Sequence, residues 1–296
     1  MRAHRFAAAA AAVLIASMGL TACSSESSSS SSSNNGDTVT VKIGTTDADQ
    51  KAWTAFADKA EDEGIHLDIV KFSEYPTVNP ALDEGQIEIS KFQTINYQAQ
   101  YNASATKDLR IIGSGEINIL GLYWKDHSSL DGIDGQEVAI PNDPSNQGRA
   151  INVLVQAGLV TLKDGASKLT PTPADIDASN SKVTVVAVDA AQTPNAYHEG
   201  RPAIINNNWL SRAGIDPASS VAADDPNSEL AEPYINVFTV HGDDLDNETY
   251  KKLVDIWHSD EVTNALEEDS NGTAVQVDRP ADELNDILDK LVKDYS

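Results

Sequence analysis

Residues 137–158 combine the features of an anion-binding site. Their sequence, EVAIPNDPSNQGRAINVLVQAG, runs from an apolar strand through a proline-containing turn directly into a helical pattern. Ser145 or Asn146 is expected to cap this helix, which would leave the backbone amides of the first turn pointing beyond the end of the strand, where they can bind an anion. Arg149 follows about one turn later, and its guanidinium group could hold a carboxylate there. From spacing alone, Arg149 could equally be a surface residue.

A second polar group follows the short apolar run in residues 203–210, which read AIINNNWL. Three adjacent asparagines offer amide donors and acceptors together, and this combination suits a zwitterion that bears an ammonium and a carboxylate. The alternative is a turn in which asparagine adopts left-handed backbone geometry. In isolation, the sequence favours the turn.

Signals of catalysis or metal binding are weak. The sequence contains no GxGxxG motif, no Walker lysine loop and no GxSxG elbow. Its six histidines lack the i, i+4 spacing of a zinc helix, and Cys23 is the only cysteine. The acidic pairs Asp224–Asp225 and Asp243–Asp244 are expected to lie in solvated loops. We therefore expect a protein that is not an enzyme, with no metal site and no cofactor.

Alternating strands and helices must position these polar residues. The expected strands cover residues 38–44, 66–72, 110–114, 121–124, 137–140 and 183–188. The expected helices cover residues 49–63, 80–86, 146–157 and 281–295. This alternation predicts an α/β fold with parallel sheets covered by helices on both faces. The pattern leaves open whether there is one sheet or two smaller lobes.

The N-terminus is typical of an exported lipoprotein. Arg2 and Arg5 precede an apolar run over residues 6–16, which is too short to span a bilayer and fits a signal peptide over residues 1–22. Cys23 ends a Leu-Thr-Ala-Cys lipobox and is expected to be acylated, becoming the new N-terminus. Two or more acyl chains give stable membrane anchoring.

Composition indicates a tether and excludes one class of partner. Residues 24–36 contain only Ser, Asn, Glu and Gly, so they cannot form a core, and residues 23–36 should act as a lipidated, flexible tether. The formal net charge is -25, which argues against nucleic acid as a partner and should keep the folded body away from an anionic membrane surface.

Several segments resemble the NlpA/MetQ lipoproteins, the substrate-binding subunits of methionine ABC importers. The likeness runs over residues 39–262, and its strongest part is VAIPNDPSNQGRA at residues 138–150. Supporting segments follow in family order: ALDEGQIE at 81–88, GLVTLKDGA at 158–166, DAAQTPNA at 189–196 and AGIDP at 213–217.

The resemblance implies two α/β lobes in a periplasmic-binding-protein-like fold, joined by a hinge, with the ligand enclosed in the cleft between them. Residues 37–118 plus 238–296 would form lobe 1, and residues 119–237 would form lobe 2. Arg149 matches the arginine that holds the ligand carboxylate, and Asn206 and Asn236 match asparagines that bind the polar end of the ligand. Tyr75 matches an aromatic wall. The expected ligand-binding set is completed by Phe92 and Asn146.

The chain departs from the family pattern near the expected side-chain half of the pocket. Where the family reads Asn-Phe-Phe-Gln-His-x-Pro-Tyr, residues 90–97 read SKFQTINY, which places Lys91, Thr94 and Asn96 at altered positions. The usual Pro-Met-Gly is Ile119-Leu120-Gly121. A lysine in this half could favour a polar or acidic ligand side chain, or a small peptide.

The resemblance therefore implies an extracytoplasmic lipoprotein, anchored on the outer face of the cell membrane, that binds an amino acid, with methionine as the first candidate. Its partners would be the permease and ATPase of an ABC importer. The alternatives are a binder of another amino acid or small peptide, a surface adhesion lipoprotein with a degenerate pocket, and a hydrolase or lyase on the same scaffold.

Overall fold

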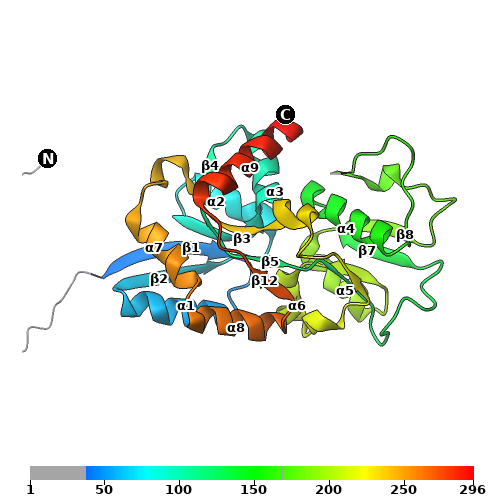
Figure 1. The fold of residues 1–296 in the computed structure, drawn as a ribbon. Coiled ribbons are helices and arrows are strands. Elements are labelled where there is room, and N and C mark those ends of the chain that lie inside the picture. Colours follow the sequence, from blue (N-terminus) through cyan, green and yellow to red (C-terminus); the bar gives the residue numbers. More distant parts are fainter. Residues whose placement is uncertain (1–37, 169) are drawn as a thin grey trace, which may run out of the picture. The chain divides into compact units, whose positions relative to one another are not determined.

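The computed structural model describes residues 38–168 and 170–296 (Figure 1). The expected signal peptide, Cys23 and the serine-rich tether lie outside the described residues. Asp37–Ser296 forms one compact unit. In the part of this unit that the structure describes, no helix has the length and apolar character needed to cross a bilayer.

A five-stranded sheet organises the first lobe, in the order β2-β1-β3-β11-β4. Its strands are β1 (Val39–Thr45), β2 (Ile65–Lys71), β3 (Ile89–Thr94), β4 (Leu109–Ser114) and β11 (Asn236–His241). β1 pairs in parallel with β2 and β3, whereas β11 pairs antiparallel to β3 and β4. Because β11 comes from late in the chain, the first lobe is built from two separate stretches of sequence.

Six helices belong to this lobe. They are α1 (Lys51–Asp62), α2 (Val78–Asp83), α3 (Ile95–Ala105), α7 (Glu248–Trp257), α8 (Asp260–Ser270) and α9 (Ala281–Tyr295). Side-chain alternation along β11 explains why both faces are covered: Phe238 packs with Trp53 of α1 and Trp257 of α7, and Val237 packs with α3 and α9. On α9, buried leucines recur at helical spacing, at Leu284, Leu288 and Leu291.

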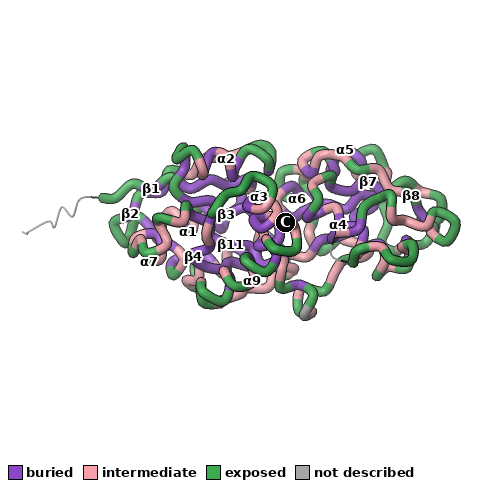
Figure 2. The backbone as a smooth tube through the Cα atoms, turned by 90° about the horizontal axis from the view of Figure 1, so that it is seen from above, coloured by how far each residue is buried: buried purple, intermediate pink, exposed green. Residues whose placement is uncertain are grey.

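A second five-stranded sheet organises the other lobe, in the order β10-β6-β9-β7-β8. Its strands are β6 (Gly121–Tyr123), β7 (Glu137–Pro141), β8 (Thr184–Val188), β9 (Ala203–Ile205) and β10 (Ala222–Ala223). Its helices are α4 (Pro144–Gln156), α5 (Thr193–His198) and α6 (Asn207–Ala213). Figure 2 shows the buried residues of each lobe concentrated around its sheet, with exposed loops outside.

The chain passes between the lobes at two places. It leaves the first lobe through β5 (Glu116–Asn118), which pairs antiparallel with β12 (Ala274–Gln276), and it enters β6 at Gly121. It returns through the 3-10 turn at Glu229–Tyr234 into β11. β11 begins at Asn236, two residues ahead of the boundary expected between residues 237 and 238, because Asn236 already pairs with Thr94 of β3.

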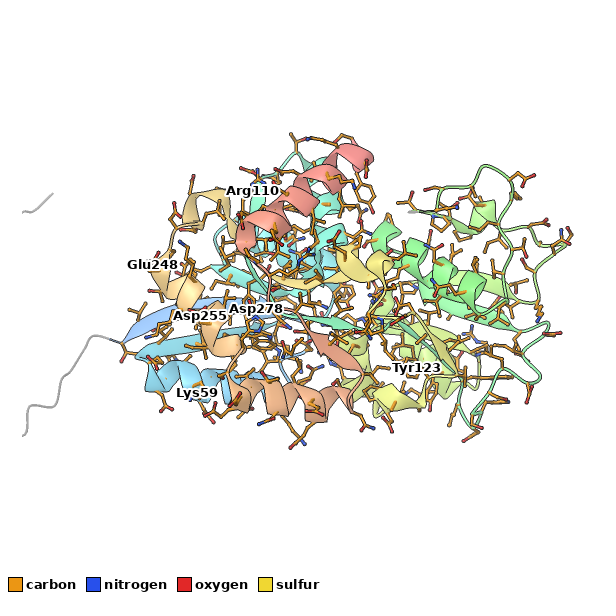
Figure 3. The ribbon with its side chains drawn as sticks, in the orientation of Figure 1. Lys59, Arg110, Tyr123, Glu248, Asp255 and Asp278 are labelled. Atoms are coloured by element: carbon orange, nitrogen blue, oxygen red, sulfur yellow. The ribbon has the colours of Figure 1, made fainter. Side chains whose placement is uncertain are left out.

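Ion pairs join neighbouring elements of the first lobe. Lys59 of α1 contacts Glu261 of α8 at 3.0 Å, and Arg110 of β4 contacts Asp289 of α9 at 2.7 Å. Figure 3 labels Lys59 and Arg110 among the side chains. These ion pairs are partly exposed to solvent, where water screens the charges, so they contribute little to stability. The buried apolar clusters therefore carry the fold.

The α/β fold class is confirmed, but the expectation of parallel sheets is only partly right. In the first sheet β11 runs antiparallel to both of its neighbours, β3 and β4. In the second sheet β6 runs antiparallel to both of its neighbours, β9 and β10. In the first lobe the physical reason is the crossing between lobes, because a strand that returns from the other lobe enters the sheet from the opposite end. The described residues also contain β3 and α3, which periodicity alone did not predict.

Candidate functional site

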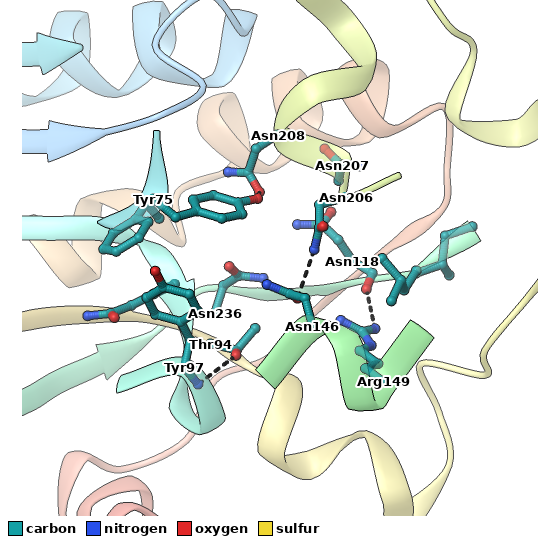
Figure 4. A pocket seen from close by; sticks show the side chains of 14 residues that line it. Tyr75, Thr94, Tyr97, Asn118, Asn146, Arg149, Asn206, Asn207, Asn208 and Asn236 are labelled. Atoms are coloured by element: carbon teal, nitrogen blue, oxygen red, sulfur yellow. Dashed lines mark hydrogen bonds between the residues drawn. The ribbon is translucent and has the colours of Figure 1, made fainter. Parts of the chain in front are cut away.

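Fourteen residues from both lobes line a cavity whose empty volume is about 400 Å³ when the open solvent at its mouth is included (Figure 4). All six residues expected to bind ligand line it: Tyr75, Phe92, Asn146, Arg149, Asn206 and Asn236. The other lining residues are Gln93, Thr94, Tyr97, Asn118, Ile119, Leu120, Asn207 and Asn208. Arg149 is the one charged residue among the fourteen, which otherwise offer amides, hydroxyls, aromatic rings and the aliphatic side chains of Ile119 and Leu120.

Helix α4 presents its N-terminus at the polar end of the cavity. The helix begins at Pro144, and Asp143 caps it, since the Asp143 carboxylate accepts a hydrogen bond from the Asn146 amide at 2.9 Å. The expectation of Ser145 or Asn146 as the cap is therefore wrong. Proline suits the first helical position because its missing N–H would have no partner there in any case.

Arg149 is buried, with 5% of its side chain exposed, and the protein itself holds it on several sides. Its Nε donates to Asp224 at 2.6 Å, one Nη donates to the Asn118 carbonyl at 2.8 Å, and its guanidinium carbon lies 4.4 Å from the centre of the Tyr234 ring. A guanidinium has five N–H groups, so others remain for a ligand carboxylate.

Asp224 is a functional candidate that sequence reasoning missed. We expected it in a solvated loop, but its side chain is 13% exposed and pairs with Arg149, while its second oxygen accepts from the Leu120 amide at 2.8 Å. Since Leu120 lies where the chain crosses between the lobes, Asp224 links Arg149 to that crossing. Its neighbour Asp225 is exposed, as expected.

The asparagines of residues 206–208 follow β9 into α6. Asn206 has an extended backbone, with φ -69° and ψ 145°, so the alternative of a left-handed turn is excluded at this residue. Its amide nitrogen donates to the side-chain oxygen of Asn146 at 2.8 Å. Asn236 approaches from the first lobe and donates to the Glu116 carbonyl at 3.2 Å.

Aromatic rings line the opposite end of the cavity. Tyr75, Phe92 and Tyr97 lie with their ring centres 5.7 to 5.8 Å apart, and Trp209 packs behind Tyr75 at 5.0 Å. Burial raises the pKa of Tyr75 well above its ordinary value, so its hydroxyl stays protonated. This end of the cavity suits an uncharged, polarizable side chain.

Hydrogen bonds from α6 connect the two lobes beside the cavity. Asn208 accepts from the Tyr75 hydroxyl at 2.9 Å and donates to Asp47 at 2.8 Å. Asn207 accepts from Gln50 at 3.3 Å. Asp47 also accepts from the Trp53 indole, and burial raises its pKa, which the charge of Lys91 partly offsets.

Comparison with known proteins decides the family. Residues 41–277 match the model of the NlpA lipoprotein family. The chain belongs to the NlpA lipoprotein family.

Relatives within the family are similar in sequence and in structure. The chain is 33% identical over 242 residues to the D-methionine-binding lipoprotein MetQ of Salmonella typhi, a match covering 80% of this chain and 88% of that protein. It superposes on protein PG110 from Staphylococcus aureus with a TM-score of 0.79 and 35% identity, covering 85% and 99% of the two chains. A methionine-bound nutrient-binding protein from Burkholderia cenocepacia gives a TM-score of 0.73 and 30% identity, with 80% and 99% coverage.

The structure shows where the side chains that depart from the family pattern lie relative to the cavity. Lys91 does not line the cavity: its Nζ lies 2.6 and 2.8 Å from the two carboxylate oxygens of Glu116 and 4.1 Å from the centre of a Trp257 ring. The hypothesis that Lys91 favours an acidic ligand is therefore wrong, because Glu116 already neutralises its charge. Asn96 also points elsewhere and donates to Ser145 at 3.0 Å.

Of the altered positions, Thr94 and Ile119 do line the cavity. Thr94 caps α3 by accepting from the Tyr97 amide at 3.3 Å, which positions the Tyr97 ring in the wall. Sequence reasoning missed Gln93, Tyr97 and Asn118 as lining residues. Asn207 and Asn208 belong to the three adjacent asparagines that the sequence offered as a polar ligand-binding group, with a turn as the alternative.

The arrangement can hold a small molecule with an anionic group, several hydrogen-bonding groups and an apolar side chain. Within the described residues, no group of three or more His, Cys, Asp or Glu side chains is placed to hold a metal ion.

Proposed function

We propose that this protein binds a free amino acid, methionine, in the cavity between its lobes and delivers it to an ABC importer. The observation that carries the proposal is the division of one cavity into a polar end, with Arg149 and the asparagines, and an aromatic end around Tyr75. Relatives at about one-third identity are named for D-methionine binding or hold methionine.

The polar end suits the backbone of an amino acid. The remaining N–H groups of Arg149 can bind the ligand carboxylate, and charge-assisted bonds of this kind replace the water that the carboxylate loses on burial. Asn206 and Asn236 supply amide groups beside it. Two amide atoms here, Asn206 Oδ1 and Asn207 Nδ2, are buried without a hydrogen-bond partner among the described residues, so an acceptor and a donor are available to a ligand.

The aromatic end suits the methionine side chain. Tyr75, Phe92 and Tyr97 present ring faces and edges, and a thioether sulfur gains about 0.3 to 1.5 kcal/mol from such contacts. Ile119 and Leu120 complete this surface. Lys91 is paired with Glu116 outside the cavity, so an acidic ligand side chain would find no cation at this end.

The proposal extends to location and motion. Acylated Cys23 would hold the protein on the outer face of the cell membrane, and the tether would let the body reach the permease of the importer. The first lobe would close on the second lobe around the ligand, with the hinge at the two chain crossings, next to β5 and β11. The protein would retain its ligand unchanged, since the lining residues include no carboxylate, histidine or cysteine that could act as an acid, base or nucleophile.

A ligand panel tests the proposal. Purified protein is unfolded and refolded to remove bound solute, and thermal unfolding is then recorded with each amino acid and with methionine-containing dipeptides. Ligand present at 100 times its dissociation constant stabilises the protein by about 2.7 kcal/mol. Stabilisation by methionine above the other amino acids is the expected result. Stabilisation by dipeptides alone, or by no small molecule, would count against methionine or against a binding role.

A further inference from the structure

Three side chains form a hydrogen-bonded series that ends in the cavity. Asp143 caps α4, Asn146 lies in the first turn of the same helix, and Asn206 follows β9 at the start of α6. Asn146 and Asn206 line the cavity, whereas Asp143 lies behind them. The series matters because an asparagine amide can face either way, and only its neighbours decide which atom it presents.

The first link fixes the orientation of Asn146. Its Nδ2 lies 3.0 Å and 3.1 Å from the two oxygens of Asp143. An ionised carboxylate only accepts hydrogen bonds, so it must face the NH2 group of Asn146 and not the oxygen. The oxygen of Asn146 is thereby turned towards Asn206.

The second link carries this orientation into the cavity. The oxygen of Asn146 accepts from Asn206 Nδ2 at 2.8 Å, so the NH2 group of Asn206 is turned towards Asn146. The remaining atom, Asn206 Oδ1, has no hydrogen-bond partner in the described structure, although Asn206 is only 8% exposed. A buried acceptor without a partner destabilises the folded protein, so a donor from the ligand would be strongly favoured there.

We propose that Asp143 is a positioning residue for ligand recognition: through Asn146 it holds Asn206 so that the oxygen of Asn206 receives the ammonium group of the ligand. The inference rests on the proposed function, because it assigns one atom of the site to one end of an amino acid. This role explains why an acidic side chain, Asp143, lies close to the cavity without lining it.

The chemistry of the ligand makes this proposal specific. An ammonium group has three donors and no acceptor, so it can bind the oxygen of Asn206 but not its NH2 group. A hydroxyl group can donate or accept, so it can bind Asn206 in either orientation. If Asp143 sets the orientation, its loss should weaken the binding of an α-amino ligand and leave the α-hydroxy analogue nearly unaffected.

The test compares L-methionine with 2-hydroxy-4-(methylthio)butanoate by calorimetry on the full-length protein in detergent, after removal of bound solute. The variants are Asp143→Asn and Asp143→Ser, since both side chains can still cap α4 but neither compels the orientation of Asn146. The matched control is Asp189→Asn. Asp189 is a half-buried acid of the same lobe that caps a 3-10 turn and does not bond to Asn146.

The wild-type protein should prefer methionine over the hydroxy analogue by at least about tenfold, because a hydrogen bond from a charged group is stronger than one from a neutral hydroxyl. Each Asp143 variant should lower this ratio about tenfold, mainly through weaker methionine binding, and Asp189→Asn should leave it unchanged. An unchanged ratio in both Asp143 variants overturns the inference, as does a wild-type ratio near one. Wild-type protein that binds neither compound would instead overturn the proposed function.

Discussion

At the scale of single residues, Arg149 is held by its own chain before any ligand arrives. Asp224 and the Asn118 carbonyl occupy two of its N–H groups, and the Tyr234 ring covers the guanidinium. A ligand carboxylate would therefore meet a guanidinium whose position is already fixed, so little side-chain entropy remains to be lost on binding. The same contacts make Arg149 important for the folded state.

We expect Arg149→Ala to weaken methionine binding by on the order of 3 to 5 kcal/mol, which is two to four decades in affinity. It should also lower the thermal stability, because Asp224 loses its cation. Arg149→Lys should recover part of the binding, since an ammonium keeps the charge but not the planar fork. Calorimetry and thermal unfolding measure the two effects, with the partly exposed Arg201→Ala as the control. A tenfold or smaller loss of affinity in folded Arg149→Ala would contradict this role.

Asp143 should leave a signature in the pH dependence of stability. Burial raises its pKa to about 6, against about 3.9 in an unfolded chain. Between these two values the folded protein binds more protons than the unfolded one, so the free energy of unfolding should fall as the pH rises from about 4 to about 6. The free energy of unfolding should change by less than about 3 kcal/mol over this range, because Asp143 is only half-buried.

Urea unfolding at several pH values measures this slope. Asp143→Asn should flatten it over that range, whereas Asp189→Asn should flatten it less, since the charge of Asp189 contributes less than burial to the raised pKa of Asp143. Equal slopes in the wild-type and Asp143→Asn proteins would show that Asp143 is not the group responsible.

Some of these residues could be identified from the sequence and others could not. Arg149 was reached both from its place after a strand and turn and from the family resemblance. Asp224 was not, because it lies 75 residues from Arg149 and its acidic surroundings look like a solvated loop. Lys91 was misread for the same reason: its partner Glu116 is 25 residues away, and only the fold brings them together.

At the scale of elements, α6 joins the two lobes at the edge of the cavity. Asn208 bonds both Tyr75 and Asp47 of the first lobe, and Arg212 donates to the Thr46 carbonyl at 2.7 Å. These bonds can form only while the lobes are together. They should therefore slow the release of ligand from the closed protein.

We expect Asn208→Ala to raise the rate of methionine dissociation by up to about thirtyfold, because two hydrogen bonds across the lobes are lost at about 1 kcal/mol each. Stopped-flow displacement of bound methionine measures this rate. Asn195→Ala provides the control, since Asn195 is an exposed asparagine whose side chain bonds only locally to Gln192. An unchanged dissociation rate would mean that α6 does not hold the closed state.

Elements with strong periodicity were predictable, and elements defined by their partners were not. The terminal helix α9 covers the residues expected from its leucine spacing. β3 and α3 gave no usable pattern because β3 is almost completely buried and lacks alternation, while α3 carries buried polar residues such as Asn96 and Gln98. The antiparallel place of β11 depends on the crossing between lobes, which no local pattern encodes.

At the scale of the whole molecule, we propose that Cys23 anchors the protein to the membrane. The family is one of lipoproteins, and the Leu-Thr-Ala-Cys sequence predicts acylation at this cysteine. Cys23→Ala should move the protein from the membrane fraction to the soluble fraction or block removal of the signal peptide. Cell fractionation and gel mobility measure this change, with Ser24→Ala as the control. Unchanged fractionation and mobility would contradict the anchor.

Calorimetric titration of the stripped wild-type protein with L-methionine tests the central claim most directly. The account predicts one saturable site per chain. It also predicts a negative heat-capacity change on binding, because the apolar side chain of the ligand is buried against the aromatic wall. The absence of any saturable heat in a folded protein shown to be free of bound solute would contradict the claim that this cavity binds the amino acid.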